Sequence, residues 1–282
     1  MGVLDGKVIL VTGGARGLGL AMAKAMAAEG AQLALVDIDG EALQQAAGEI
    51  ERIGGRQSVV PIGAEVCDPD SASTAVHYTV DNFGRIDALF NNAAVGPDQV
   101  AGDFYGDAPK FWELNPYVFL RMMEVNAAGP QLMAASAAPY MIEQGFGRIV
   151  NITTAMDAMY ASGMGGYGPS KAALEAHTAI MARDLEGTGV TANVLIPGGP
   201  ANTRMIPDST GIPRDALIQP EAMQGPAVWL ASDASSDFQG RRLIAALWDA
   251  VLPITARLEK CSAPCAWPQL GRQAILPGNI RR

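Results

Sequence analysis

The sequence predicts an α/β fold in which helices cover both faces of a doubly wound, parallel sheet of about seven strands, and three observations support this. Short apolar runs alternate with longer stretches that have the 3.6-residue period of helices, the pattern of consecutive β-α-β units. The 282 residues are 49% hydrophobic and 17% charged, which provides a large core and excludes a disordered chain. The first apolar run also leads directly into a glycine-rich turn and a helical pattern.

Seven apolar runs are expected to form the strands. They lie at residues 8–12, 33–37, 59–62, 86–90, 148–152, 191–196 and 242–246. Six stretches rich in Ala, Leu and Met are expected to form helices. These are residues 18–29, 41–53, 71–83, 118–144, 170–186 and 220–231. The crossovers between parallel strands are expected to be right-handed.

No internal repeat, low-complexity tract or flexible linker divides the chain, so residues 1–252 are expected to form a single domain. Residues 95–116 form a long connection, and long connections in compact domains often have a functional or lid-like role. Residues 253–282 show no clear period and are expected to form a C-terminal extension.

The chain carries 20 Lys and Arg against 29 Asp and Glu, a formal net charge of −9. Such a field repels nucleic-acid phosphates and anionic lipid headgroups, so neither nucleic acid nor a membrane is an expected partner. The longest apolar stretch, residues 243–256, is interrupted by Asp249 and Pro253 and is too short to span a bilayer. No signal peptide is visible in residues 1–6, so a cytoplasmic location is expected.

The three cysteines, Cys67, Cys261 and Cys265, are an odd number in a long chain, and disulfide scaffolds are not built that way. Both histidines lie far in sequence from Cys261 and Cys265. We expect free thiols and no metal site, with a zinc site as the less favoured alternative.

Positions 12 to 19, after the first predicted strand, read Thr-Gly-Gly-Ala-Arg-Gly-Leu-Gly. In such a turn Gly13, Gly17 and Gly19 let backbone amides approach a pyrophosphate at the positive end of a helix. The spacing differs from the common dinucleotide-binding motif G-x-G-x-x-G. The physical reason for the glycines, a tight turn that a phosphate can approach closely, still applies to this chain. A purely structural glycine turn is the alternative.

Asp37 ends the second predicted strand, 20 residues after Gly17. A carboxylate there accepts hydrogen bonds from the adenosine ribose hydroxyls and repels a 2′-phosphate. Arg16 has the opposite effect because a guanidinium pairs with that phosphate, but Ile38 supplies no second cation. We therefore favour NAD over NADP as the cofactor. A solvated residue at a strand end is the structural alternative for Asp37.

Tyr167 and Lys171 lie four residues apart at the start of a predicted helix, so they share one helical face. Pro169 between them is compatible with a helix only in its first turn. A phenol has a pKa of about 10 and is a poor base at neutral pH, but a neighbouring ammonium and a helix N-terminus both favour the phenolate. The pair is therefore expected to act as an acid or a base.

Thr153 and Thr154 follow the fifth predicted strand at the carboxyl edge of the sheet, where open α/β folds bind their ligands. A hydroxyl there can hydrogen-bond a substrate oxygen and stabilise the charge that develops on it. The glycine-rich turn is expected at the same edge.

Together these features resemble the short-chain dehydrogenases/reductases, a family with a Rossmann-like fold. The resemblance covers the chain from Gly6 to about Gly240, and its motifs agree in order and spacing. They are residues 12–19, Asp37, residues 91–94, Asn126, Thr154, Tyr167, Lys171 and residues 197–199. The resemblance implies an NAD(P)-dependent alcohol dehydrogenase or ketone reductase that transfers a hydride between C4 of the nicotinamide and a carbinol or carbonyl carbon.

The resemblance also implies roles for single residues. Tyr167 would exchange the hydroxyl proton, and Lys171 would lower the tyrosine pKa and bind the nicotinamide ribose. Thr154 would orient the substrate oxygen, and Asn126 would hold a water in a proton relay, with a polar helix face as its structural alternative. These four are the expected catalytic residues. The expected cofactor-binding residues are Gly13, Arg16, Gly17, Leu18, Gly19, Asp37, Glu65, Val66, Asn92, Ala93, Ala94, Tyr167, Lys171, Pro197, Gly198 and Thr203.

The chain departs from the family pattern at three of these positions. Thr154 stands where the family usually has Ser, which keeps the hydroxyl but adds a methyl group that crowds the pocket. Reduced or narrowed activity is one expected consequence. Glu65 stands where an Asp commonly meets the adenine ring, and Ala94 replaces the usual glycine.

Two further departures affect the second half of the chain. The loop after Gly199 is one residue longer than the common form, which leaves Asn202 and Thr203 as alternative cofactor contacts, and we assign Thr203. After Gly240 the family's Asp-Gly-Gly is missing, so the last strand is the least secure of the seven. The alternative to a cofactor-binding role for residues 197–198 is a turn with only a structural role.

The wall of the substrate pocket is expected to be apolar and adaptable. Its expected members, for which ordinary packing is an equal alternative, are Met156, Met159, Tyr160, Met164, Met205 and Ile206. No arginine cluster is placed to clamp an anion, so the expected substrate is a largely apolar secondary alcohol or ketone. The family resemblance also implies a homotetramer or homodimer.

Two other functions stay open on the sequence alone. A nucleotide-dependent dehydratase or epimerase on the same fold would use the cofactor without net change in NADH. A non-catalytic dinucleotide-sensing scaffold is conceivable because Thr154 replaces Ser, although intact Tyr167, Lys171 and Asn126 argue against it.

Overall fold

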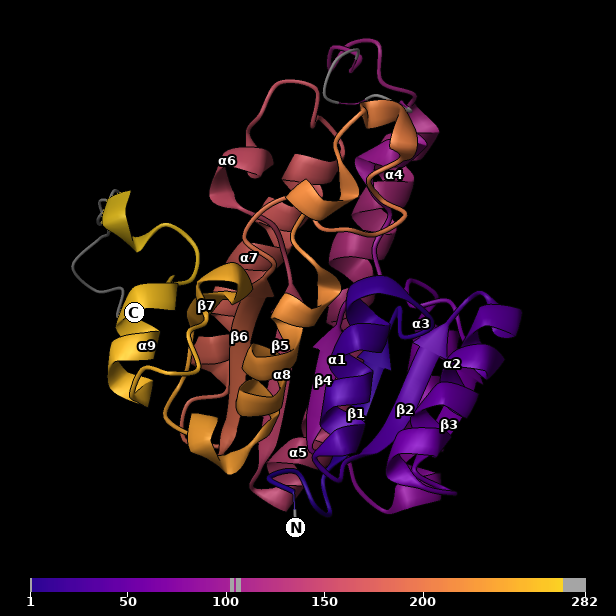
Figure 1. Ribbon diagram of the computed structural model, residues 1–282, viewed down its shortest axis with the longest axis vertical. Helices are drawn as coiled ribbons and strands as arrows, with labels where there is room; N and C mark the ends of the chain where they lie inside the picture. Colours follow the sequence, from indigo (N-terminus) through magenta and orange to yellow (C-terminus); the bar gives the residue numbers. More distant parts are fainter. Residues whose placement is uncertain (1, 102–103, 105–107, 271–282) are drawn as a thin grey trace, which may run out of the picture.

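The computed structural model describes residues 2–101, 104 and 108–270, whose eight strands form one sheet (Figure 1). The strands are β1 (Val8–Thr12), β2 (Gln32–Asp37), β3 (Val59–Gly63), β4 (Ala88–Asn91), β5 (Gly147–Ile152), β6 (Val190–Ile196), β7 (Arg241–Ile244) and β8 (Ser262–Pro264). Their order is β3-β2-β1-β4-β5-β6-β7-β8. The first seven are parallel, and β8 runs antiparallel to β7. The strand order reverses between β1 and β4, so the predicted doubly wound sheet is confirmed.

Helices pack on both faces of this sheet. The α-helices of the described residues are α1 (Gly17–Ala28), α2 (Gly40–Gly54), α3 (Pro69–Phe83), α4 (Pro116–Met123), α5 (Gly129–Gln144), α6 (Met156–Met159), α7 (Tyr167–Asp184), α8 (Gln224–Ala231) and α9 (Ile254–Cys261). Buried side chains of α1, α2 and α8 form one core cluster with the strands, and those of α3, α5 and α7 form a second. Every position of β1 and β6 is buried, as expected for parallel strands covered on both sides.

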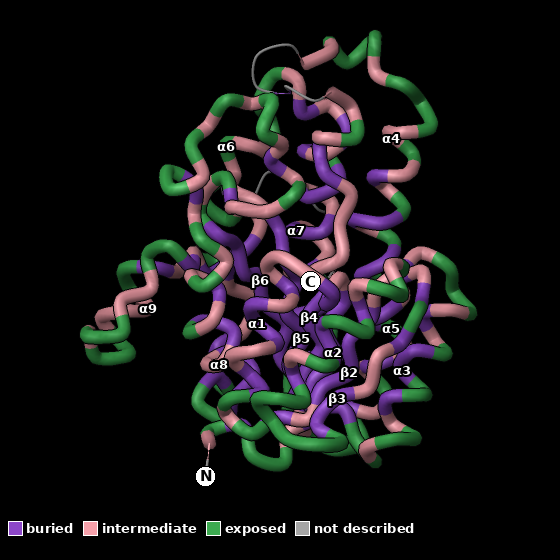
Figure 2. Tube along the Cα trace, turned by 45° about the vertical axis from the view of Figure 1, so that its right-hand side comes forward, coloured by how far each residue is buried: buried purple, intermediate pink, exposed green. Residues whose placement is uncertain are grey.

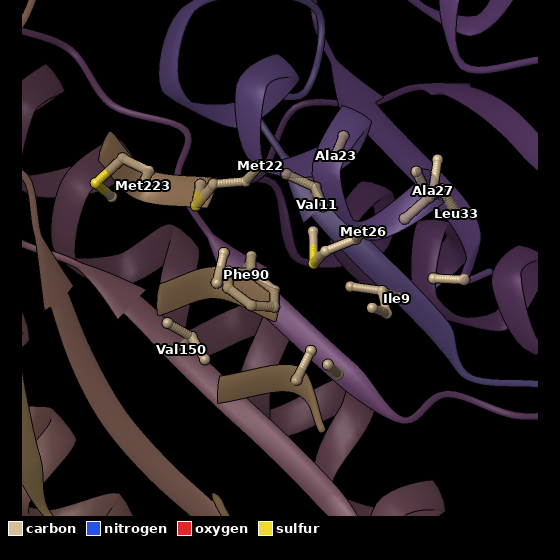
Figure 3. Close-up of a cluster of buried hydrophobic side chains, with 14 of the residues drawn as sticks. Ile9, Val11, Met22, Ala23, Met26, Ala27, Leu33, Phe90, Val150 and Met223 are labelled. Carbon is tan, nitrogen blue, oxygen red and sulfur yellow. The ribbon is translucent and has the colours of Figure 1, made fainter. Parts of the chain in front are cut away.

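The core beneath α1 consists of aliphatic, methionine and aromatic side chains (Figure 3). Phe90 of β4 is fully buried and lies among Val150 of β5 and Met22 and Met26 of α1. Figure 2 shows the buried trace concentrated along the strands, with exposed trace at both ends of the molecule. The close packing keeps the strands rigid, so their carboxyl ends can hold loops in defined positions.

Three segments differ from the sequence-based expectation. Residues 118–144 are not one regular helix, because a π-helical turn at Glu124–Ala128 separates α4 from α5. Pro130 accounts for the irregularity, since it has no N–H for the carbonyl four residues earlier. Residues 220–231 begin with a 3₁₀ turn at Pro220–Met223, and the last predicted strand ends at Ile244, before a 3₁₀ turn at Ala245–Leu247.

Residues 253–270 contain more secondary structure than their lack of period indicated. It forms α9 and then β8, which pairs with β7 at Arg241–Pro264 and Arg242–Ala263. Three residues that include a proline carry no strand signal, and the open edge of β7 supplies the pairing partner. Residues 271–282 of the expected extension lie outside the described residues.

Two long connections lie at the carboxyl edge of the sheet, where ligands bind in such folds (Figure 1). One follows β4, and its residues 102–103 and 105–107 are outside the described part of the chain. The other follows β6 and is held by Arg214, which donates to the carbonyl of Ile206 at 2.8 Å and pairs with Asp208. Within the described ranges, no helix is both long enough and apolar enough to cross a membrane.

Candidate active site

A cleft of about 1840 Å³ crosses the carboxyl ends of the central strands. Predicted site residues that line it are Gly13, Arg16, Gly17, Leu18, Asp37, Glu65, Val66, Asn92, Ala93, Ala94, Thr154, Tyr167, Lys171, Pro197 and Thr203. Three predicted residues, Gly19, Asn126 and Gly198, are not part of this lining. The glycine-rich turn with Asp37 and the Tyr167–Lys171 pair with Thr154 therefore line one cleft. We call the first group the nucleotide end of the cleft and the second its chemical end.

The glycine-rich turn lines the cleft where a nucleotide is expected, and Gly13 and Gly19 have no room for a side chain. Gly13 and Gly17 have φ values of +61° and +53°, in the left-handed region that favours glycine. A Cβ on Gly13 would lie 2.9 Å from the Cα of Ala93, and one on Gly19 would lie 2.2 Å from the carbonyl oxygen of Gly13. Gly19 thus shapes the turn from beneath. This bare backbone at the start of α1 suits a phosphate-bearing ligand.

Asn92, the residue directly after β4, holds the same turn in place. Its side-chain amide donates to the carbonyls of Thr12 and Gly13, both at 3.0 Å. The Thr12 hydroxyl in turn accepts the backbone N–H groups of Asn92 and Ala93, at 3.0 and 3.1 Å. The predicted segment at residues 91–94 therefore fixes the turn as well as lining the cleft.

The carboxylate of Asp37 lies at the end of β2 and contacts the turn. It accepts the backbone N–H of Ala15 at 3.2 Å and that of Asp39 at 3.1 Å. Asp39, which the sequence reasoning missed, caps α2 and pairs with Arg16. The hydrogen bond from Arg16 lowers the pKa of Asp39, and Arg204 adds to this effect. Two carboxylates and two guanidinium groups therefore gather at the adenosine end.

Glu65 forms an ion pair with Arg121 of α4, and both line the cleft. Burial opposes ionisation of Glu65, yet the hydrogen bond from Arg121 leaves its pKa below the ordinary value. The same guanidinium donates to the sulfur of Cys67 at 2.9 Å. Sequence reasoning identified Glu65 but missed Arg121, which lies on a distant helix.

Tyr167 begins α7 and, with Lys171, lies at the chemical end of the cleft. The Nζ of Lys171 is 5.9 Å from the centroid of the Tyr167 ring and donates to the carbonyl of Ile152 at 2.9 Å. Only 2% of Lys171 is exposed, and this burial lowers its pKa to about 8. A cation is therefore held beside the phenol in surroundings of low polarity, where charge interactions are strong.

The side chain of Asn126 lies in the π-helical turn and is fully buried. Its carbonyl oxygen accepts the N–H of Val95 at 2.8 Å, and its amide donates to the carbonyl of Val95 at 2.9 Å and to the hydroxyl of Ser170 at 3.0 Å. It therefore ties the loop after β4 to the first turn of α7. The polar atoms of its side chain are thus used in these contacts, and the water-holding role of Asn126 stays a prediction.

The two threonines after β5 have different environments. The hydroxyl of Thr153 is buried and donates to Glu175 at 2.9 Å. Thr154 is half-buried and lines the cleft, and its backbone carbonyl accepts a hydrogen bond from Arg242 at 2.8 Å. Both threonines line the cleft, and Thr154 is the more exposed of the two.

The substrate end of the cleft agrees only in part with the apolar wall that the sequence predicts. Met164, Met205 and Ile206 line it, whereas Met156, Met159 and Tyr160 do not. The reason is the turn at α6, where Met159 is buried and Tyr160 is 74% exposed. Phe104 also contributes to the lining, and it packs with Met164 and Ile206.

Two arginines of the loop after β6, Arg204 and Arg214, also reach the cleft. Asp208 neutralises Arg214, and Arg204 acts on Asp39 at the nucleotide end. Among the described residues, no group of three or more His, Cys, Asp or Glu could hold a metal ion.

Replacing Lys171 with Met is expected to change how the stability of the cofactor-free protein depends on pH. Between the folded pKa of about 8 and the ordinary value of 10.5, the unfolded chain binds a proton that the folded chain lacks. The free energy of unfolding of the wild type should therefore rise with pH, by about 2–3 kcal/mol relative to K171M between about pH 7.5 and about pH 10. Urea unfolding of both proteins at each pH measures it, and a pH-independent difference would contradict it.

Known proteins with similar sequences and folds indicate the family to which this chain belongs. The short chain dehydrogenase family model matches residues 7–210. The 2,5-dichloro-2,5-cyclohexadiene-1,4-diol dehydrogenase of Sphingobium indicum is 31% identical over 84% of this chain and 93% of its own. The 3-oxoacyl-[acyl-carrier-protein] reductase of Thermotoga maritima is 31% identical over 84% and 95%. A crystal structure of NAD⁺-bound xylitol dehydrogenase superposes with a TM-score of 0.72 at 26% identity, covering 84% and 96%.

The family resemblance seen in the sequence is thus confirmed by a family match over most of the chain and by relatives that cover 84% of it. Family members use nicotinamide cofactors, and the glycine turn, Asp37 and the Tyr167–Lys171 pair of this chain lie in one cleft that suits such a group. The protein is a member of the short-chain dehydrogenase/reductase family.

Proposed function

We propose that the protein is an NAD(H)-dependent oxidoreductase that interconverts a largely apolar secondary alcohol and the corresponding ketone. The observation that carries this proposal is the position of the buried Lys171 ammonium, 5.9 Å from the Tyr167 ring, in the cleft that also contains the glycine turn. Family membership supports oxidoreductase chemistry in general.

In this proposal, different residues of the cleft bind the substrate, transfer the proton and position the catalytic groups. When bound, the nicotinamide would supply or accept the hydride. Tyr167 donates a proton to the carbonyl oxygen during reduction and removes the hydroxyl proton during oxidation. Lys171 stabilises the phenolate by its positive charge, and the hydroxyl of Thr154 hydrogen-bonds the substrate oxygen. Asn126 holds the loop after β4 and the start of α7 in a fixed relative position through its hydrogen bonds to both.

The choice of substrate class rests on Met164, Met205, Ile206 and Phe104, which give the cleft an adaptable apolar wall. Asp208 neutralises Arg214, and Arg204 acts on Asp39 at the nucleotide end of the cleft, which supports an uncharged substrate. A relative whose name describes a chlorinated cyclic diol is consistent with a neutral, mostly apolar alcohol.

A panel of neutral secondary alcohols with NAD⁺, and of the matching ketones with NADH, tests the proposal through the absorbance of NADH. We expect turnover of apolar members and little activity on their carboxylated or phosphorylated analogues. Cofactor binding without turnover of any member would favour a dinucleotide-sensing scaffold instead.

Replacing Asp37 with Ser is expected to shift the cofactor preference from NADH toward NADPH. The carboxylate is placed to accept ribose hydroxyls and to repel a 2′-phosphate, and hydrogen bonds to charged groups contribute about 1.5–3 kcal/mol. NADH binding, followed by fluorescence, should weaken about 10- to 100-fold while the NADPH-to-NADH affinity ratio rises. Asp70→Ser, at an exposed acid of α3, is the control and should leave the ratio unchanged. An unchanged ratio in D37S would remove the case for NAD.

We also propose that residues 1–252 form the catalytic domain, that residues 253–282 extend it, and that the protein is a cytoplasmic homotetramer or homodimer. The acidic composition supports a small-molecule substrate over nucleic acid. Light scattering measures the oligomer size, and a monomer at assay concentration would contradict the oligomer.

A further inference from the structure

A buried ion pair lies behind the chemical end of the cleft without lining it. Glu175 of α7 has no exposed side-chain surface, and the side chain of Arg242 of β7 is 7% exposed. The Nε of Arg242 is 3.7 Å from a carboxylate oxygen of Glu175. Neither residue is part of the predicted site, and both face inward.

Each member of this pair holds one residue at the end of β5. Glu175 accepts the hydroxyl of Thr153 at 2.9 Å. Arg242 donates to the backbone carbonyl of Thr154 at 2.8 Å. The residue that presents its hydroxyl to the cleft is therefore anchored through its own peptide group to a guanidinium on a different strand.

The pair also connects β5 to the C-terminal segment. The second carboxylate oxygen of Glu175 accepts the N–H of Ala266 at 3.2 Å. Ala266 has a φ of +61°, a left-handed conformation that is unfavourable for alanine and is kept only where its surroundings hold it. Residues just before it form β8, which pairs with β7 beside Arg242.

Stability alone does not explain the pair. Removing two charges from water is costly, and well-packed apolar residues often replace buried ion pairs without loss of stability. The Nε of Arg242 also has no hydrogen-bond partner in the structure, so the geometry is not optimised for the pair itself. What the pair does provide is a hydrogen bond to each of Thr153 and Thr154.

We propose that Glu175 and Arg242 are positioning residues that hold Thr154 in the orientation needed for catalysis. The inference rests on the proposed function. The carbonyl and the side chain of Thr154 belong to the same residue, so fixing its peptide group restricts where its hydroxyl points. Misplacement of a reacting group by about 1 Å can lower a rate by about 100-fold.

The test compares Arg242→Met with the double variant Glu175→Gln/Arg242→Met, which removes both charges and avoids leaving a buried carboxylate unpaired. We expect kcat on the best alcohol of the panel to fall about 10- to 100-fold in both variants, while the Kd for NADH stays near that of the wild type. Thermal stability should fall in the single variant and recover in the double. Arg241→Met is the matched control, because this neighbour donates to Ser262 at 3.0 Å, away from Thr154.

Recovery of kcat together with stability in the double variant would overturn the proposal, because the loss would then come from structure alone. Unchanged kcat in Arg242→Met would overturn it as well. Amide hydrogen exchange gives a readout that does not depend on turnover, and we expect faster exchange at residues 153–155 in the double variant. If the wild type turns over no alcohol, the proposed function fails, and unchanged exchange at these residues then overturns the positioning role independently.

Discussion

Replacing Tyr167 with Phe is expected to abolish turnover while leaving NADH binding intact. The variant keeps the ring that packs at the start of α7 and loses only the hydroxyl that we propose to exchange the proton. Because general acid–base catalysis contributes about 10²- to 10⁴-fold, kcat should fall by at least about 100-fold. The measurement is steady-state turnover with the best alcohol of the panel, together with NADH titration.

Tyr160→Phe is the matched control for this experiment. Tyr160 is 74% exposed, its hydroxyl donates to Asp157 at 2.9 Å, and it does not line the cleft. Its variant should retain wild-type kcat. Full activity in Y167F would show that the proton moves by another route and would remove Tyr167 from the mechanism.

Replacing Gly19 with Ala is expected to damage cofactor binding although Gly19 does not line the cleft. The added Cβ would lie 2.2 Å from the carbonyl oxygen of Gly13 and 2.6 Å from the amide nitrogen of Asn92, so the turn must shift. Overpacking of this kind costs about 1–3 kcal/mol, which corresponds to about 5- to 150-fold weaker NADH binding. NADH titration measures the effect.

Gly48→Ala serves as its control, because Gly48 lies inside α2 and nothing within 4 Å would meet the new Cβ. This variant should bind NADH normally and should be more stable by about 0.5–1 kcal/mol, since alanine restricts the unfolded chain and favours a helix. NADH affinity in G19A equal to that in G48A would contradict the account of the turn.

Features that depend on local sequence were predictable. β1 covers residues 8–12, as its apolar run indicated, and α7 begins at Tyr167, three residues before the expected helix at 170–186. The strained turn was recognisable because only glycine tolerates positive φ at Gly13 and Gly17 without strain. These signals lie within a few residues of one another, so they can be read without knowing the fold.

Partnerships between distant segments were not predictable. Arg121 of α4 meets Glu65 after β3, and Arg242 of β7 meets Glu175 of α7, only because the fold brings together segments that are far apart in sequence. Neither ion pair produces a spacing or hydrophobic pattern that can be recognised in the sequence. The short strand β8 was missed for the same reason, since its pairing comes from the open edge of β7.

The pocket wall shows how proximity in sequence can mislead. Met159 and Tyr160 lie only a few residues before Tyr167, yet one is buried and the other faces solvent. A single helical turn at α6 determines their directions. Phe104, more than sixty residues before Tyr167, reaches the same cleft as the tyrosine.

The most direct test of the central claim follows a labelled hydride into product. Wild-type protein is incubated with a ketone of the panel and NADH in which both hydrogens at C4 of the nicotinamide are deuterium, and the product is examined by mass spectrometry. The account predicts an alcohol with deuterium on its carbinol carbon, formed by the wild type and not by Y167F. An unlabelled product, or a dehydrated or epimerised product formed without net consumption of NADH, would contradict it.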